Sequence, residues 1–170
     1  MEKCTLIITE KPDAAKRIAS ALKEKGKVHR NEDNGVPYYK AGRDKEIVVV
    51  PALGHLYTIT EERKGRNYYP VFNFRWVPRY AAERGAKQIR NWIETISKLS
   101  EEAEMFIDAC DYDIEGSVIG YYILKYACGN KEKMAKRMKY STLTEKELIK
   151  AYEDPLPQLD FALIEAGETR

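Results

Sequence analysis

Apolar segments alternate along the chain with segments of helical spacing, and twice a strand-like run leads directly into a helix-like one. The first run, residues 5–9, is rich in β-branched side chains and predicts a strand, and Pro12 to Gly26 predict the helix that follows it. The second run, residues 105–110, leads into a predicted helix that stops at Gly129. This order favours an α/β fold, in which parallel strands carry helices on their faces.

A third apolar run, residues 46–53, predicts a central strand of the same sheet. We therefore expect a parallel sheet of about four strands flanked by helices, with an inserted loop and strand region within residues 54–103. The shorter patterns predict a strand over 27–29, a turn over 31–35, a strand over 36–41, a helix over 81–99, a strand over 138–141, a helix over 145–153 opened by a capping box of Thr144 and Glu147, and a helix over 158–169.

Three carboxylates follow the strand over 105–110 at alternate positions: Asp111, Asp113 and Glu115. Acids this close repel one another unless protons or a cation neutralise them. Mg²⁺ suits the site because oxygen atoms and one or two carboxylates are its usual ligands. The alternative is a solvated acidic turn that caps the helix, and the spacing alone leaves both interpretations open.

Glu10 and Lys11 lie at the other predicted strand-to-helix junction. If the two strands are parallel neighbours, both junctions meet at one edge of the sheet, where ligands of open α/β sheets bind. The sequence then predicts a carboxylic acid, an ammonium and a metal at one site.

These segments resemble the Toprim domain, which has a Rossmann-like fold, and in detail that of type IA DNA topoisomerases of the archaeal or topoisomerase-III-like kind. The motifs that carry the resemblance are Leu6–Pro12, Gly54–Leu56, Tyr69–Pro78, Asp111–Gly116, Tyr140–Thr144 and Ala166–Arg170. They cover nearly the whole chain, in the order that this family has.

The resemblance implies an enzyme that cuts one DNA strand through a tyrosyl phosphodiester, passes a strand and reseals the break with Mg²⁺. It implies a general acid or base at Glu10 and stabilisation of the scissile phosphate by Lys11. Metal binding would fall to Glu10, Asp111, Asp113 and Glu115, with Glu115 acting in support of the others. DNA contacts would come from Lys11, His55 and Arg170.

Two positions depart from the commoner pattern of the family. Where many members have an arginine and a second carboxylate, this chain has Ile114 and Ser117. The loss of the arginine puts in doubt any binding of phosphate at that position. Lys11 follows the topoisomerase-III-like pattern, whereas Lys16 is expected on the helix surface.

Residues 63–90 hold eight Lys/Arg, one acid and six aromatics. Basic residues interleaved with aromatic rings can bind single-stranded DNA. The alternative is that Phe72, Phe74 and Trp76 alternate along a strand and form its inner face. Residues 1–95 carry 19 Lys/Arg against 12 Asp/Glu, and residues 96–170 carry 10 against 15, which suits a polyanion held beside a metal site.

The chain has no apolar run long enough for a membrane span and no signal peptide, so a cytoplasmic protein is expected. Its three cysteines lack metal-ligand spacing and are expected as buried thiols. We expect a Toprim domain over 1–156 and, over 157–170, the start of a helix that leads into a further domain carrying the catalytic tyrosine. The 170 residues alone are therefore expected to be inactive.

Two other functions stay open on the sequence. The acid motif also occurs in Toprim primases and nucleases, although the aromatic insertion argues against these. A nucleic-acid-binding module without catalysis could keep the acids as a structural ion site, and metal-dependent cleavage would separate it from the enzymes.

Overall fold

The computed structural model describes residues 3–61 and 74–169. Its centre is a six-stranded sheet in the order β2-β3-β4-β1-β7-β8. The strands are β1 (Cys4–Thr9), β2 (Lys25–Asp33), β3 (Val36–Gly42), β4 (Ile47–Pro51), β7 (Ala103–Asp108) and β8 (Lys136–Arg137). Strands β4, β1, β7 and β8 are parallel to one another, so the expected parallel sheet of about four strands is confirmed, and β3 and β2 extend it with antiparallel pairing.

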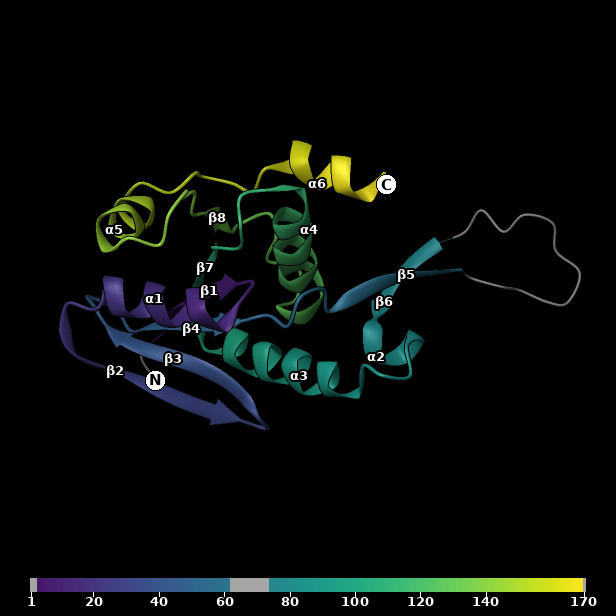
Figure 1. Ribbon diagram of the computed structural model, residues 1–170, viewed down its shortest axis with the longest axis horizontal. Helices are drawn as coiled ribbons and strands as arrows, with labels where there is room; N and C mark the ends of the chain where they lie inside the picture. Colours follow the sequence, from purple (N-terminus) through teal and green to yellow (C-terminus); the bar gives the residue numbers. More distant parts are fainter. Residues whose placement is uncertain (1–2, 62–73, 170) are drawn as a thin grey trace, which may run out of the picture.

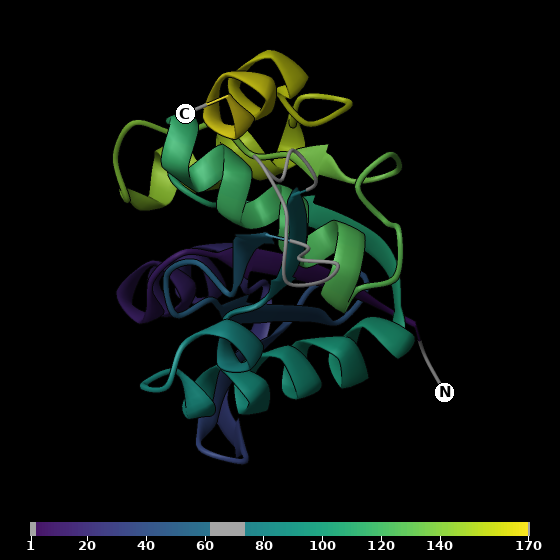
Figure 2. The same ribbon diagram turned by 90° about the vertical axis from the view of Figure 1, so that its right-hand side faces the viewer.

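Helices cover both faces of this sheet (Figures 1 and 2). Helices α1 (Pro12–Leu22) and α5 (Glu145–Glu153) pack on one face, against Ile7 of β1 and Val49 of β4. Helix α3 (Lys87–Glu101) and helix α4 (Ile114–Tyr122) with its π-helical continuation η1 (Ile123–Ala127) pack on the other face, against Leu6 and Ile8. The alternation along β1 follows from the period of two in a strand, and both faces of this strand are buried.

The inserted region forms a separate two-stranded antiparallel sheet of β5 (Tyr57–Glu61) and β6 (Phe74–Pro78). This sheet projects from the body of the molecule beside α4 and η1 (Figure 1). The short helix α2 (Arg79–Ala82) connects it to α3, and the last helix, α6 (Phe161–Glu168), packs across α4. Residues 62–73, which contain much of the basic and aromatic segment, lie outside the described residues.

Several predicted boundaries were wrong. The helix expected over 81–99 is broken at Glu83–Ala86 into α2 and α3. Helix α1 ends at Leu22, and Gly26 instead adopts a positive φ of 71° within β2. The turn between β2 and β3 is confined to Asn34 and Gly35, and β8 ends before the strand expected at 138–141.

The capping box expected for α5 does not form. Thr144 is the N-cap residue, but its side chain does not bond to the helix amides. Glu147 instead accepts hydrogen bonds from the Ser141 amide and the Thr142 hydroxyl, and so it ties the helix to the preceding loop. The three cysteines are buried free thiols, as predicted.

Candidate metal and DNA-binding site

The carboxyl ends of β1 and β7 lie side by side, because Ile8 pairs with Asp108 in the parallel register. The chain leaves β1 through Glu10 and Lys11 and leaves β7 through a turn that contains Asp111 and Asp113. The Lys11 ammonium lies 3.6 Å from Oδ2 of Asp111, and both side chains are accessible to solvent. The two strand-to-helix junctions therefore meet at one edge of the sheet, as the sequence predicted.

Glu10 occupies the inner side of this edge. Its Oε2 atom is buried and has no hydrogen-bond partner among the residues that the structure describes. Burial, and next the negative charge of Asp111, raise the pKa of the Glu10 carboxyl above its ordinary value, while Lys11 opposes the shift. A proton on the Glu10 carboxyl, or a cation beside it, would therefore stabilise this part of the site.

Asp113 caps helix α4. Its Oδ1 accepts a hydrogen bond of 2.7 Å from the Gly116 amide, so the alternative role of helix cap is realised for this residue. Gly116 packs so closely on the turn that a Cβ atom there would overlap the carbonyl oxygen of Asp111. A glycine is therefore required for the acids to lie against the start of the helix.

Glu115 faces His55 instead of the other two acids. Its Oε2 lies 2.6 Å from Nε2 of His55. The Arg79 side chain fixes the main chain of the histidine by donating a hydrogen bond of 2.8 Å to the His55 carbonyl. Arg79 also forms an ion pair with Glu83. We call the turn that carries Asp111 and Asp113 the acid turn. The pair of Glu115 and His55 links the start of α4, next to this turn, to the inserted region. The spacing of the acids did not predict this contact.

A buried arginine lies beneath the acid turn. Arg137 has no exposed surface and donates to the carbonyl oxygens of Cys110 at 2.5 Å and Asp111 at 2.8 Å. It also lies 3.5 Å from the carboxylate of Asp108, whose pKa burial raises and Arg137 lowers. Tyr140 adds a hydrogen bond of 2.6 Å to the Ala109 carbonyl. In the sequence Arg137 lies within residues 131–139, a run rich in lysine and arginine, and such runs are normally solvated.

Tyr112, between the two aspartates, donates a hydrogen bond of 2.8 Å to Asp160 at the start of α6. This bond raises the pKa of Tyr112 and lowers the pKa of Asp160. The sequence analysis did not single out either residue.

Two open hollows flank the acid turn. One, of about 460 Å³, is lined by Asp111, Tyr112, Lys139, Tyr140, Ser141 and Leu143. The other, of about 470 Å³, lies between the inserted sheet, α4 and α6, and its lining includes His55, Arg79, Glu115 and Trp76. An extended ligand could therefore approach the turn from either side.

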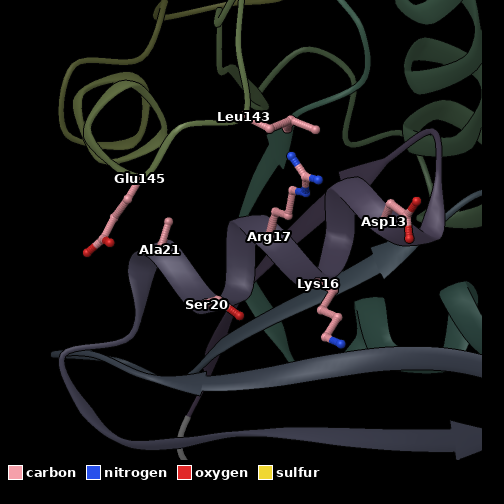
Figure 3. A pocket seen from close by; sticks show the side chains of 7 residues that line it. All are labelled: Asp13, Lys16, Arg17, Ser20, Ala21, Leu143 and Glu145. Carbon is pink, nitrogen blue, oxygen red and sulfur yellow. The ribbon is translucent and has the colours of Figure 1, made fainter.

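A third hollow, of about 420 Å³, lies between α1 and the start of α5 (Figure 3). The Arg17 side chain points across it toward Leu143, whereas Lys16 points away from Arg17 on the other side of the helix. Acids line the hollow too, at Asp13 and Glu145. Lys16 is exposed on the helix, where the sequence analysis expected it.

Two aromatic residues of the inserted region, Tyr57 and Trp76, pack against rings of the α4 and η1 helices. The Trp76 ring stacks on Tyr122 with centroids 3.9 Å apart, and Tyr57 lies 5.2 Å from Tyr126. For Trp76 this favours the interpretation as the inner face of a strand. The expected DNA contact at Arg170 lies outside the described residues, as do Tyr68, Tyr69 and Phe72.

The residues at the edge fit a small, hard cation. In the part of the chain that the structure describes, no three acidic, histidine or cysteine side chains gather closely enough to form an ion site by themselves. Mg²⁺ does not need such a cage, since it commonly binds one or two carboxylates and keeps waters or substrate oxygens as its other ligands. The unpartnered oxygen of Glu10 beside Asp111 is a donor set of this kind.

A largely parallel α/β sheet with acids, a lysine and a glycine at its carboxyl edge is the arrangement of an open α/β domain, which binds its ligand at that edge. Residues 5–143 match the Toprim domain family, and the chain belongs to this family.

Curated relatives include DNA topoisomerase 1 of Methanocaldococcus jannaschii, 47% identical over 167 residues, and DNA topoisomerase 1 of Pyrococcus horikoshii, 45% identical over 166 residues. These alignments cover 97% of this chain but only 21% and 24% of the relatives, so the chain spans less than a quarter of their length. A solved structure of full-length topoisomerase I from Thermotoga maritima has a TM-score of 0.62 at 20% identity, over 97% of this chain and 23% of that one, and supports the fold. No helix in residues 3–61 and 74–169 is both long and apolar enough to cross a bilayer.

Proposed function

We propose that this chain is the Toprim part of a type IA DNA topoisomerase, which cuts one DNA strand through a tyrosyl phosphodiester and reseals it. The observation that carries the proposal is the meeting of Glu10, Lys11 and Asp111 at the edge of β1 and β7. These are the group types that cleavage and resealing of a phosphodiester require. The attacking tyrosine would come from a further part of the protein, outside these 170 residues, into which helix α6 would lead.

Glu10 would act as the general acid or base that gives a proton to, or takes it from, the 3′-oxygen of the broken strand. A carboxyl is most effective in this role when its pKa approaches the working pH, and burial beside Asp111 moves the pKa of Glu10 in that direction. Lys11 would stabilise the negative charge that develops on the scissile phosphate. Its exposed ammonium is free to turn from Asp111 toward a bound strand.

Glu10, Asp111 and Asp113 would hold Mg²⁺, with Glu115 in support. Asp113 uses one oxygen to cap α4, which leaves its second oxygen for the ion. Glu115 would act through its contact with His55. When bound, the ion supplies positive charge that neutralises and orients the phosphate during resealing.

DNA would lie across the same edge, with His55, Lys11 and Arg170 in contact with its backbone. His55 borders the hollow beside the inserted sheet, where an imidazole can donate to a phosphate oxygen. The excess of basic residues in the first 95 positions favours binding of a polyanion. We propose a preference for single-stranded DNA, because a type IA mechanism cuts one strand, and a location with the chromosome in the cytoplasm.

A whole protein that contains this chain provides the test. Incubated with a single-stranded oligonucleotide and then denatured, it should give a covalent protein–DNA adduct, and Mg²⁺ should convert the adduct back to intact DNA. The Asp111→Asn/Asp113→Asn variant should form the adduct but reseal slowly. Hydrolysis to free ends without any adduct would favour a Toprim nuclease, and binding without cleavage would favour a module that lacks catalysis.

A further inference from the structure

Tyr112 connects the acid turn to the last helix of the chain. Its hydroxyl donates a hydrogen bond of 2.8 Å to Oδ2 of Asp160, and Oδ1 of the same carboxylate accepts the Leu163 amide at 3.1 Å. Asp160 is the N-cap residue of α6. One carboxylate therefore bonds both to the turn that carries Asp111 and Asp113 and to the first turn of α6.

Two cations contact the aromatic ring of Tyr112, in addition to the hydrogen bond that its hydroxyl makes. The Arg137 guanidinium lies 5.1 Å from the ring centroid and the Lys139 ammonium lies 4.7 Å from it. Cations at these distances are attracted to the face of a tyrosine ring. Because Arg137 is buried and also bonds to the Asp111 carbonyl, the ring rests on the same support as the turn.

Helix α6 is seated on α4, the helix that starts at the acid turn. A Cβ atom at Gly167 would overlap the Val118 side chain, which shows how closely the two helices approach. Ile164 is buried between them and the core, and the Tyr122 hydroxyl bonds to Glu168 at the far end of α6. Helix α6 thus contacts the acid turn through its N-cap residue and contacts α4 through its last turn.

We propose that Tyr112 is a positioning residue through which the acid turn and helix α6 stabilise each other, so that a divalent cation at the turn strengthens the seating of α6. The inference rests on the proposed metal site. A cation bound by Asp111 and Asp113 favours one geometry of the main chain between them, and the bond from Tyr112 to Asp160 favours the seated helix in that same geometry. Such a coupling is reciprocal, so loosening α6 must weaken metal binding by the same factor.

Tyr112→Phe tests the coupling, because it removes the hydroxyl and keeps the ring beside its two cations. Mn²⁺ replaces Mg²⁺ as the probe. Electron paramagnetic resonance measures the concentration of free Mn²⁺ as the 170-residue chain is titrated. We expect about fivefold weaker binding in the variant, at the low end of measured coupling factors. Tyr121→Phe is the matched control: Tyr121 lies on α4 and packs edge-on against Phe161 of α6, and its variant should bind as the wild type does.

Hydrogen exchange of the same chain gives a second measurement. Saturating Mg²⁺ should slow amide exchange in α6 as well as in the acid turn of the wild type, and in Tyr112→Phe the slowing should be confined to the turn. Slowing in the turn without any in α6 of the wild type, or equal Mn²⁺ affinity in Tyr112→Phe, would overturn the coupling alone. A wild-type chain in which neither segment responds and no Mn²⁺ binds would contradict the proposed metal site, and the coupling with it.

Discussion

The Lys11 ammonium lies 3.6 Å from a carboxylate oxygen of Asp111, at an edge shared by two neighbouring parallel strands. Far apart in the sequence, the two residues are brought together by the pairing of β1 with β7. An exposed ion pair of this kind contributes little to stability, because water screens it. Because the pair lies beside the buried oxygen of Glu10, it agrees with the proposed role of Lys11 at the scissile phosphate better than with a role in stability.

Lys11→Ala should slow DNA cleavage in the whole protein by about 10²-fold, since a cation aimed at developing charge is worth several kcal/mol. Lys16→Ala is the control, because it removes the same charge from the surface of the same helix. Single-turnover cleavage of an oligonucleotide measures both. Equal losses in the two variants would mean that Lys11 acts only through general attraction of DNA.

Glu10→Gln should stabilise the metal-free chain at neutral pH. Because burial and Asp111 raise the pKa of Glu10 above 4.5, the stability that its protonated form provides is complete below that pH and is lost as the pH rises through the raised pKa. The amide keeps the neutral form at every pH. We expect a gain of no more than about 1 kcal/mol, because the side chain is only partly buried and solvent screens the charge.

Thermal unfolding across the range from pH 4 to pH 8 measures this gain, with Glu101→Gln at the end of α3 as the control. The gain should vanish at the acid end of the range. A Glu10→Gln variant less stable than the wild type at neutral pH would show that the ionised carboxylate is stabilised by the fold.

Gly116→Ala should destabilise the chain by about 1–3 kcal/mol, the usual range for forcing an atom into filled space. The added methyl group would overlap the Asp111 carbonyl, which belongs to the main chain and cannot swing aside. Gly85→Ala is matched to it, since no atom lies within 4 Å of a Cβ there. Urea denaturation of both variants tests the prediction, and equal stabilities would mean that the turn opens at little cost.

The 170-residue chain should form no covalent adduct with DNA. A phenol needs a lowered pKa or a nearby base before it attacks phosphate well. Burial instead raises the pKa of Tyr57 and of Tyr140, and it raises that of Tyr122 together with the bond to Glu168. Single-stranded DNA incubated with the chain and Mg²⁺ should show no shifted band on a denaturing gel. A band that a single tyrosine variant removes would place the nucleophile in this chain.

Apolar periodicity was enough to predict the parallel strands of the sheet and the meeting, at one edge, of the two strand-to-helix junctions that carry acids. The runs in β1, β4 and β7 are buried on both faces, which gives them a strong signal, and parallel pairing then fixes where the residues after them lie. The helix over 81–99 failed because apolar spacing continues across Gly85, where the chain turns between α2 and α3.

The finer contacts of the site depend on tertiary packing that no local pattern encodes. In the sequence Arg137 is one cation of a basic run, yet it is buried because the end of β7 and the acid turn direct carbonyl groups toward it. The pairing of Glu115 with His55 depends on how the inserted region packs beside α4. Residues far apart in sequence meet in both cases, and only the three-dimensional structure brings them together.

The central claim is that the acids at this edge hold Mg²⁺, and calorimetric titration of the chain tests it most directly. Asp111→Asn/Asp113→Asn should keep the fold, because asparagine caps a helix as well as aspartate does, and should abolish the heat of Mg²⁺ binding. Asp154→Asn, at the end of α5, should bind as the wild type does. Unchanged Mg²⁺ affinity in the double variant would contradict the assignment of the site.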